Sequence, residues 1–262
     1  MKRDLTMLLD PDEPAPVRVL RADGGSDLVL TADHAGRAIP RRLGTLGLPQ
    51  SELDRHIAWD IGIAGVTERL SAALDAVAIL QAYSRLVIDC NRSPDVPSSI
   101  PEISETTEIP GNRGVTGAER LSREREIFAP YHARMDQLLE TRRQAGRRTV
   151  LIAMHSFTPV FRGESRTMHV GVLYNRDTRL ALILLDLLRA EPGLSTGDNA
   201  PYSVSDLTDY TVPVHAERRG LPHVEVEIRQ DLIADERGQS DWAGRFARLL
   251  TEADRRLGEI GA

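Results

Sequence analysis

Two histidines follow apolar runs that are expected to form buried strands. A strand that only packs in a core does not need a polar imidazole at its end, so these histidines are candidates for chemistry. His34 follows LVLTAD, and His155 follows VLIAM. A lone histidine is usually a hydrogen-bonded structural group, but catalytic zinc commonly takes three His or carboxylate ligands and leaves a fourth position for water. We therefore predict a metal site with both histidines. Asp60 is the preferred third ligand, and His56, one helical turn before it, is the alternative.

The run HVEVEIR at 223–229 alternates apolar and acidic residues. Strand geometry places Glu225 and Glu227 on one face and the intervening valine on the other. A metal-dependent hydrolase needs a carboxylate that takes a proton from water and passes it to the leaving amine. Either glutamate could serve as this base. The alternative is an exposed edge strand that carries two solvated carboxylates.

Two arginines follow asparagines in turn-like contexts, Arg92 after Asn91 and Arg113 after an asparagine in PGNRG. An arginine offers a planar fork for a carboxylate, so this pair suits an anionic amino-acid substrate. A surface ion pair is the competing interpretation, and for Arg113 it is the favoured one. Ser156 follows His155 and is expected to line the substrate pocket, since the chain has no G-x-S-x-G element to make a serine nucleophile.

The composition excludes several classes of chemistry. The single cysteine, Cys90, rules out an internal disulfide framework and a cysteine-rich zinc site, and Lys2 is the only lysine, which makes Schiff-base and P-loop chemistry improbable. The net charge of -6 and the lack of a basic run argue against nucleic-acid partners. No apolar stretch is long enough to span a membrane, and the acidic opening is unlike a signal peptide. We expect a cytoplasmic enzyme of small molecules that could form a homo-oligomer.

The order of the expected elements predicts how these residues are positioned. Residues 1–16 form an irregular arm, and residues 17–262 form one domain in which apolar strands alternate with amphipathic helices. Strands are expected at 27–34, 76–91 (one or two), 149–155, 168–175 and 223–229. Helices are expected at 48–74 (continuous or interrupted near Gly62), 116–143, 176–191 and 240–258. Residues 93–114 form a long loop. This order predicts an α/β fold of three αβα layers around a mostly parallel mixed sheet, with its ligand site at the carboxyl ends of the strands.

Several phrases of the sequence, in order and from about residue 27 to 250, together resemble the N-formylglutamate amidohydrolase family. They are TADHAGRAIP, DRHIAWDIGIAG, YSRLVIDCNRSP, AMHSFTPVFRG, VGVLYNRD and DYTVPVHAERRGLPHVEVEIRQDLI. The resemblance implies a phosphorylase/hydrolase-like fold similar to that of zinc carboxypeptidases and bacterial cell-wall amidases.

Carried over by position, the resemblance implies His34, Asp60 and His155 as ligands of Zn²⁺ or another divalent metal, and Glu227 as the base. It also implies that Asn91 and Arg92 hold a carboxylate. One departure is that Arg37 stands where the carboxypeptidases have a metal-binding glutamate, so the acidic ligand must come from elsewhere.

The expected reaction is metal-dependent hydrolysis of the N-acyl amide of an acidic amino acid, with N-formyl-L-glutamate giving formate and L-glutamate as the lead. The resemblance implies histidine degradation as its context. A deacylase of another N-acyl amino acid or small peptide, and a binding protein without turnover, remain the alternatives.

Overall fold

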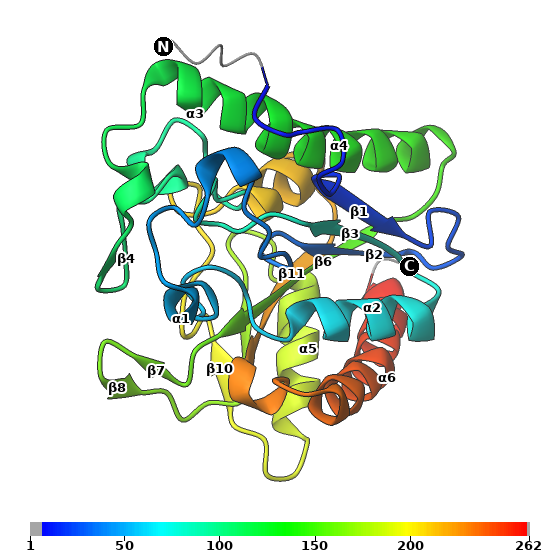
Figure 1. The fold of residues 1–262 in the computed structure, drawn as a ribbon. Helices are drawn as coiled ribbons and strands as arrows, with labels where there is room; N and C mark the ends of the chain where they lie inside the picture. Colours follow the sequence, from blue (N-terminus) through cyan, green and yellow to red (C-terminus); the bar gives the residue numbers. More distant parts are fainter. Residues whose placement is uncertain (1–6, 261–262) are drawn as a thin grey trace.

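A seven-stranded mixed sheet forms the centre of the computed structural model, which describes residues 7–260 (Figure 1). The strands, in their order across the sheet, are β1 (Val17–Leu20), β3 (Val77–Gln81), β2 (Leu28–Ala32), β6 (Val150–Phe157), β11 (His223–Arg229), β9 (Val170–Leu173) and β10 (Thr196–Asp198). Strands β3, β2, β6 and β11 are parallel to one another, whereas β1 and β9 run antiparallel to their neighbours β3 and β11. The sheet is therefore mostly parallel, as predicted.

Helices cover both faces of this sheet. One face carries α2 (Ile63–Leu74), α5 (Arg179–Arg189) and α6 (Glu236–Ile260), and the other carries α4 (Ala129–Gln144) with the π-helical turn Glu124–Phe128 before it (Figure 1). Alternate strand residues serve the two cores, since Leu30 packs toward α2 and α6 whereas Val29 belongs to the core under α4. These layers confirm the expected three-layer αβα fold.

Smaller elements complete the chain. They are the helices α1 (Gln50–Leu53) and α3 (Gly117–Arg123), the hairpin of β4 (Ile103–Ser104) and β5 (Thr107–Glu108), the hairpin of β7 (Val160–Phe161) and β8 (Glu164–Ser165), the π-helical turn Val212–Ala216, and the 3-10 turns Arg41–Leu43, Pro97–Ser99, Pro110–Asn112, Glu217–Arg219 and Gln230–Leu232. None of the helices in the described range is long and apolar enough to cross a membrane. Of the expected arm, residues 7–16 contain no helix or strand and residues 1–6 lie outside the description.

Two local expectations are wrong, the number of strands and the position of Asp60 on a helix. Strands β1 and β10 were not expected. Of the one or two strands expected over 76–91, the structure has one, β3, followed by turns. The helix expected over 48–74 is interrupted near Gly62, the alternative that the sequence left open, because residues 54–62 form turns between α1 and α2. Asp60 therefore lies in a turn and not on a helix. The break falls at Gly62, whose φ of 81° is in the left-handed region that favours glycine.

Gly62→Ala is expected to destabilise the fold. A Cβ at this position would lie 2.1 Å from the carbonyl oxygen of Ile233, in addition to the strain of a left-handed residue, which costs about 1–3 kcal/mol. Gly244→Ala is the matched control, because Gly244 is exposed within α6 and no atom lies near its Cβ position. Alanine at this helix position should raise the free energy of unfolding by about 0.5–1 kcal/mol. Chemical denaturation of both variants measures the difference, and equal stabilities would contradict the role of Gly62.

Candidate active site

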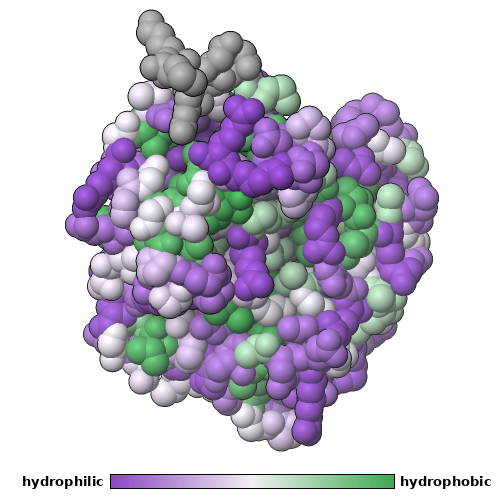
Figure 2. Space-filling model, in the orientation of Figure 1, coloured by the Kyte–Doolittle hydropathy of each residue, from purple (hydrophilic) through white to green (hydrophobic). Residues whose placement is uncertain are grey.

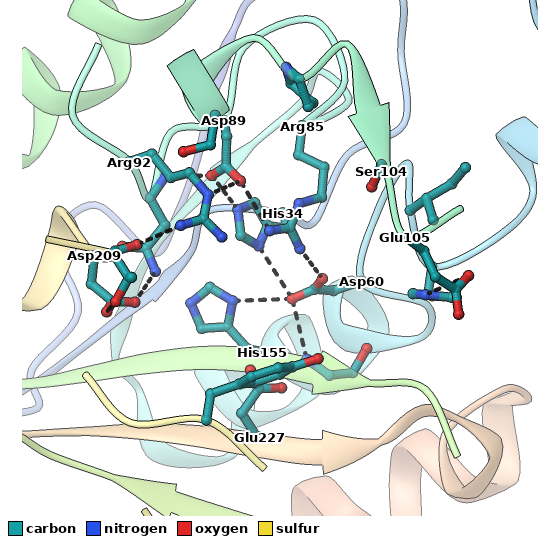
Figure 3. Close-up of a pocket in the computed structure, with 18 of the residues that line it drawn as sticks. His34, Asp60, Arg85, Asp89, Arg92, Ser104, Glu105, His155, Asp209 and Glu227 are labelled. Atoms are coloured by element: carbon teal, nitrogen blue, oxygen red, sulfur yellow. Dashed lines mark hydrogen bonds and ion pairs between the residues drawn. The ribbon is translucent and has the colours of Figure 1, made fainter. Parts of the chain in front are cut away.

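The site lies at the carboxyl ends of β2, β6 and β11, in a cavity of about 540 Å³ (Figure 3). His34 follows β2, His155 lies in the last part of β6, and Glu227 is the direct cross-strand partner of His155 on β11. One ligand atom from each of His34, Asp60 and His155 falls within 4.8 Å of the other two. The fold thus brings together the three residues that the sequence indicates as a metal site.

All three side chains of this cluster are buried. The Nδ1 atom of His155 lies 3.0 Å from Oδ2 of Asp60, and Nδ1 of His34 lies 3.5 Å from the same oxygen. Burial works against the charged form of Asp60, but His34 and His155 hold the pKa of this carboxyl far below its ordinary value. Asp60 therefore offers an ionised oxygen to the centre of the cluster.

Carboxylates behind the two histidines orient their rings. Nε2 of His34 lies 2.7 Å from Oδ1 of Asp89, and Nε2 of His155 lies 3.4 Å from Oδ2 of Asp33, so each ring turns its Nδ1 toward Asp60. Metal-binding histidines commonly pair their second nitrogen with a carboxylate in this way. Nδ1 of His34 is also buried without a hydrogen-bond partner, which is costly unless a ligand completes it.

The charge of the cavity fits a cation. Six carboxylates and two arginines line it. Because a buried excess of negative charge is expensive to maintain, a divalent cation between His34, Asp60 and His155 would suit both the donor set and the charge. The residues present therefore fit a zinc-type ligand set of two imidazoles and one carboxylate.

The turn that carries Asp60 is fastened to both histidine-bearing strands. The backbone N–H of Asp60 donates to the carbonyl of His34 at 2.9 Å, and the N–H of Ser156 donates to Oδ2 of Asp60 at 3.2 Å. The Ser156 hydroxyl donates to the carbonyl of Ile61 at 2.9 Å. Ser156 thus lines the cavity as expected, but its hydroxyl holds the turn in place.

The two glutamates of β11 are buried in the middle of the sheet, because β6 and β9 flank this strand. The exposed-edge alternative is therefore wrong. Burial raises the pKa of Glu227 to about 7, against the opposing effect of His155. Burial raises the pKa of Glu225 well above its ordinary range, where Asp209 and Glu227 add to the effect. A base is most effective with a pKa near the working pH, which favours Glu227.

Of the three residues expected to hold the substrate carboxylate, Asn91 and Arg92 line the cavity and Arg113 does not. Arg92 lines it and donates through Nη1 to the carbonyl of Thr208 at 2.9 Å. Asn91 also lines it, but its Oδ1 accepts the N–H groups of Tyr210 and Thr211, so its amide mainly holds that loop. Arg113 lies outside the cavity, exposed and ion-paired with Glu108, so the surface interpretation applies.

His56, the alternative third ligand, lines the cavity but stands outside the three-residue cluster. Its Nε2 atom lies 3.6 Å from Oε2 of Glu105, a residue of the β4–β5 turn. The geometry therefore favours Asp60 over His56 as the third ligand.

Several site residues were not singled out from the sequence. Arg85 lies 2.9 Å from Asp89 and 3.4 Å from Asp60, which makes its guanidinium a positive charge beside the cluster. A pair of buried histidines lies behind the cavity, where Nε2 of His132 is 2.9 Å from the carbonyl oxygen of Cys90 and Nδ1 is 2.8 Å from His215. Arg85 and Asp33 both fall inside the sequence phrases that resemble the family. This resemblance is the signal that could have singled them out.

Cys90 is expected to be unreactive in the folded protein. Its side chain is fully buried, and burial raises the pKa of its thiol well above the ordinary value, so the thiolate needed for alkylation is scarce. Native protein should take up almost no iodoacetamide at neutral pH, and the unfolded chain should take up one equivalent. Rapid labelling of the native protein would contradict this prediction.

Comparison with known proteins identifies the family. The model of the family described as N-formylglutamate amidohydrolase matches residues 26–234. A solved structure of a gene product from Agrobacterium tumefaciens is 38% identical, with a TM-score of 0.92 over 97% of this chain and 100% of that chain. An N-formylglutamate amidohydrolase from Ralstonia eutropha is 19% identical, with a TM-score of 0.65 over 94% and 98% of the two chains, and so shows the shared fold. A search of curated proteins finds no match.

An amide-cleaving hydrolase is therefore the class of protein that the fold and the family define. The chain belongs to the N-formylglutamate amidohydrolase family, and the resemblance seen in the sequence is confirmed.

Proposed function

We propose that this protein hydrolyses the N-acyl amide of an acidic amino acid in a metal-dependent reaction, with N-formyl-L-glutamate, giving formate and L-glutamate, as the lead substrate. The observation that carries the proposal is the close grouping of His34, Asp60 and His155 beside Glu227, in a cavity that Arg92 also lines. The family description supports the same choice of substrate.

In this proposal His34, Asp60 and His155 hold a zinc ion, and the buried carboxylates Asp89 and Asp33 keep the two imidazoles oriented. Zinc, when bound, supplies Lewis acidity that polarises the amide carbonyl and makes water a better nucleophile. Every other part of the chemistry falls to side chains of the chain itself.

Glu227 takes a proton from the attacking water as its oxygen bonds to the acyl carbon, and returns the proton to nitrogen as the C–N bond breaks. The products are a carboxylic acid and a free amine, so atoms balance without a further reactant. Arg92 pairs with the substrate carboxylate, and its Nη2 atom has no protein partner among residues 7–260. Arg85 places a second positive charge near the carbonyl oxygen, where negative charge develops.

The test is formate release from N-formyl-L-glutamate by the purified protein, first stripped of metal and then reloaded with zinc. We expect no release from the stripped protein and recovery with about one equivalent of zinc. Zinc binding without release from any N-acyl amino acid would contradict the proposed activity and favour a binding protein.

A further inference from the structure

We propose that the cavity contains an acyl compartment, lined by His56, Ile103, Ser104 and Phe161, that accepts uncharged acyl groups larger than formyl. The inference rests on the proposed function and deepens it, because N-formyl-L-glutamate remains a substrate of the same site but is hydrolysed less efficiently than substrates with a larger neutral acyl group. These four side chains come from the turn after α1 and from the two hairpins β4–β5 and β7–β8. We expect the best substrates to be N-acyl amino acids whose acyl group has several carbons and one hydrogen-bonding group.

The direction of the substrate follows from the arrangement of the side chains. Figure 3 shows Arg92 and Asp209 on one side of the metal cluster and Ser104 and Glu105 on the other. With the substrate carboxylate at Arg92 and the scissile amide at the cluster, the acyl group must point toward Ser104. A formyl group has only a hydrogen atom beyond its carbonyl carbon, so it would leave this side of the cavity empty.

The acyl side belongs to a cavity of about 540 Å³ that extends over both the Arg92 side and the Ser104 side of the cluster. A second hollow of about 410 Å³ adjoins it, since both share His56 and Glu105 in their walls. Binding cavities of several hundred Å³ usually hold ligands of drug-like size. The acyl side of the metal cluster therefore continues beyond the first carbon.

The walls of this space combine apolar surface with two unmet polar atoms. Nε2 of His56, which lies 3.6 Å from Oε2 of Glu105, is buried without a hydrogen-bond partner, and so is Oε1 of Gln230 in the wall of the adjoining hollow. A polar atom of the acyl group would satisfy His56. Among residues 7–260, eight large apolar side chains are exposed, and three of them, Ile103, Val160 and Tyr202, line the cavity or the hollow beside it. Figure 2 shows apolar groups interspersed with polar ones on one face of the molecule.

Charge argues against an anionic acyl group. Glu105 already uses its carboxylate, which accepts the N–H of Arg162 at 3.0 Å and forms an ion pair with Arg55. These contacts also join the turns of the β4–β5 and β7–β8 hairpins, so the wall is held from both sides. The Glu105 carboxylate lines the cavity on this side and would repel a second carboxylate. The positive charge of Arg166 lies outside the cavity lining, where its Nη1 atom donates to the Tyr202 hydroxyl at 2.8 Å. A neutral acyl chain therefore fits these surroundings better than an anionic one.

The experiment compares zinc-loaded wild-type protein on N-formyl-, N-acetyl-, N-butyryl-, N-acetylglycyl- and N-succinyl-L-glutamate, by release of the common product glutamate. We expect kcat/KM for the butyryl and acetylglycyl substrates to exceed that for formyl by about tenfold or more, since one methylene in an apolar pocket is worth about tenfold or more. Succinyl should fall below butyryl. The highest value for formyl would overturn the acyl compartment while leaving the proposed function intact, and no release from any substrate would overturn both.

A variant tests the polar group. His56→Ala should lower the acetylglycyl-to-formyl ratio of kcat/KM by about tenfold, because the acyl hydrogen bond is lost. His169→Ala, at a histidine outside the cavity, is the matched control and should keep the wild-type ratio. An unchanged ratio in properly folded, zinc-loaded His56→Ala would overturn the role of His56, whereas the wild-type series decides the compartment even if this variant does not fold.

Discussion

Glu227→Gln is expected to lower kcat on N-formyl-L-glutamate by about 10²–10⁴-fold, the contribution of a positioned general base. Glutamine keeps the shape of the side chain in β11 but cannot accept the proton of water. Zinc should remain bound in one equivalent, because Glu227 is not part of the ligand cluster. Rates from glutamate release and metal content from atomic absorption measure the two effects.

Glu225→Gln is the matched control for this prediction. Glu225 lies two residues earlier on the same face of β11, and burial raises the pKa of its carboxyl well above the ordinary value, which favours the neutral form. A neutral amide should therefore replace it with less than a tenfold loss in kcat. If Glu225→Gln is the more damaging of the two variants, the base is Glu225 and our assignment is wrong.

Asp60→Asn is expected to weaken zinc binding by more than the 10–100-fold that loss of a supporting group costs, and to abolish turnover at ordinary zinc concentrations. The carboxylate is the only anionic group of the three-residue cluster, and it is the one that both histidines face. Competition with a chelating dye measures the zinc dissociation constant, and denaturation shows whether the variant is folded.

Two further variants serve as controls for the effect of Asp60→Asn on zinc binding. Asp89→Asn removes the carboxylate behind His34 and should cost only about 10–100-fold in zinc affinity. His56→Ala should keep the wild-type affinity, because His56 stands outside the cluster. Strong zinc binding by Asp60→Asn together with weak binding by His56→Ala would make His56 the third ligand.

The fold class could be predicted from local properties of the chain. The apolar runs that became β2 and β6, the apolar–acidic alternation that became β11, and the amphipathic periodicity of α5 and α6 are visible in short windows of sequence. The short strands β1 and β10 carry weaker patterns, and their pairing with β3 and β9 depends on neighbours far along the chain. That is why they were missed.

The residue types of the candidate site could also be predicted, since the proposed metal-dependent hydrolysis requires histidine, carboxylate and arginine side chains, and strand ends are where such groups meet. Which groups meet is a property of the folded chain. Asp60 reaches His155 across 95 residues of sequence, from a turn that Gly62 makes possible, and Asp89 reaches His34 across 55. Arg113, by contrast, pairs at the surface. Contacts between distant segments depend on how helices and turns pack around the sheet, and this packing has no local signature in the sequence.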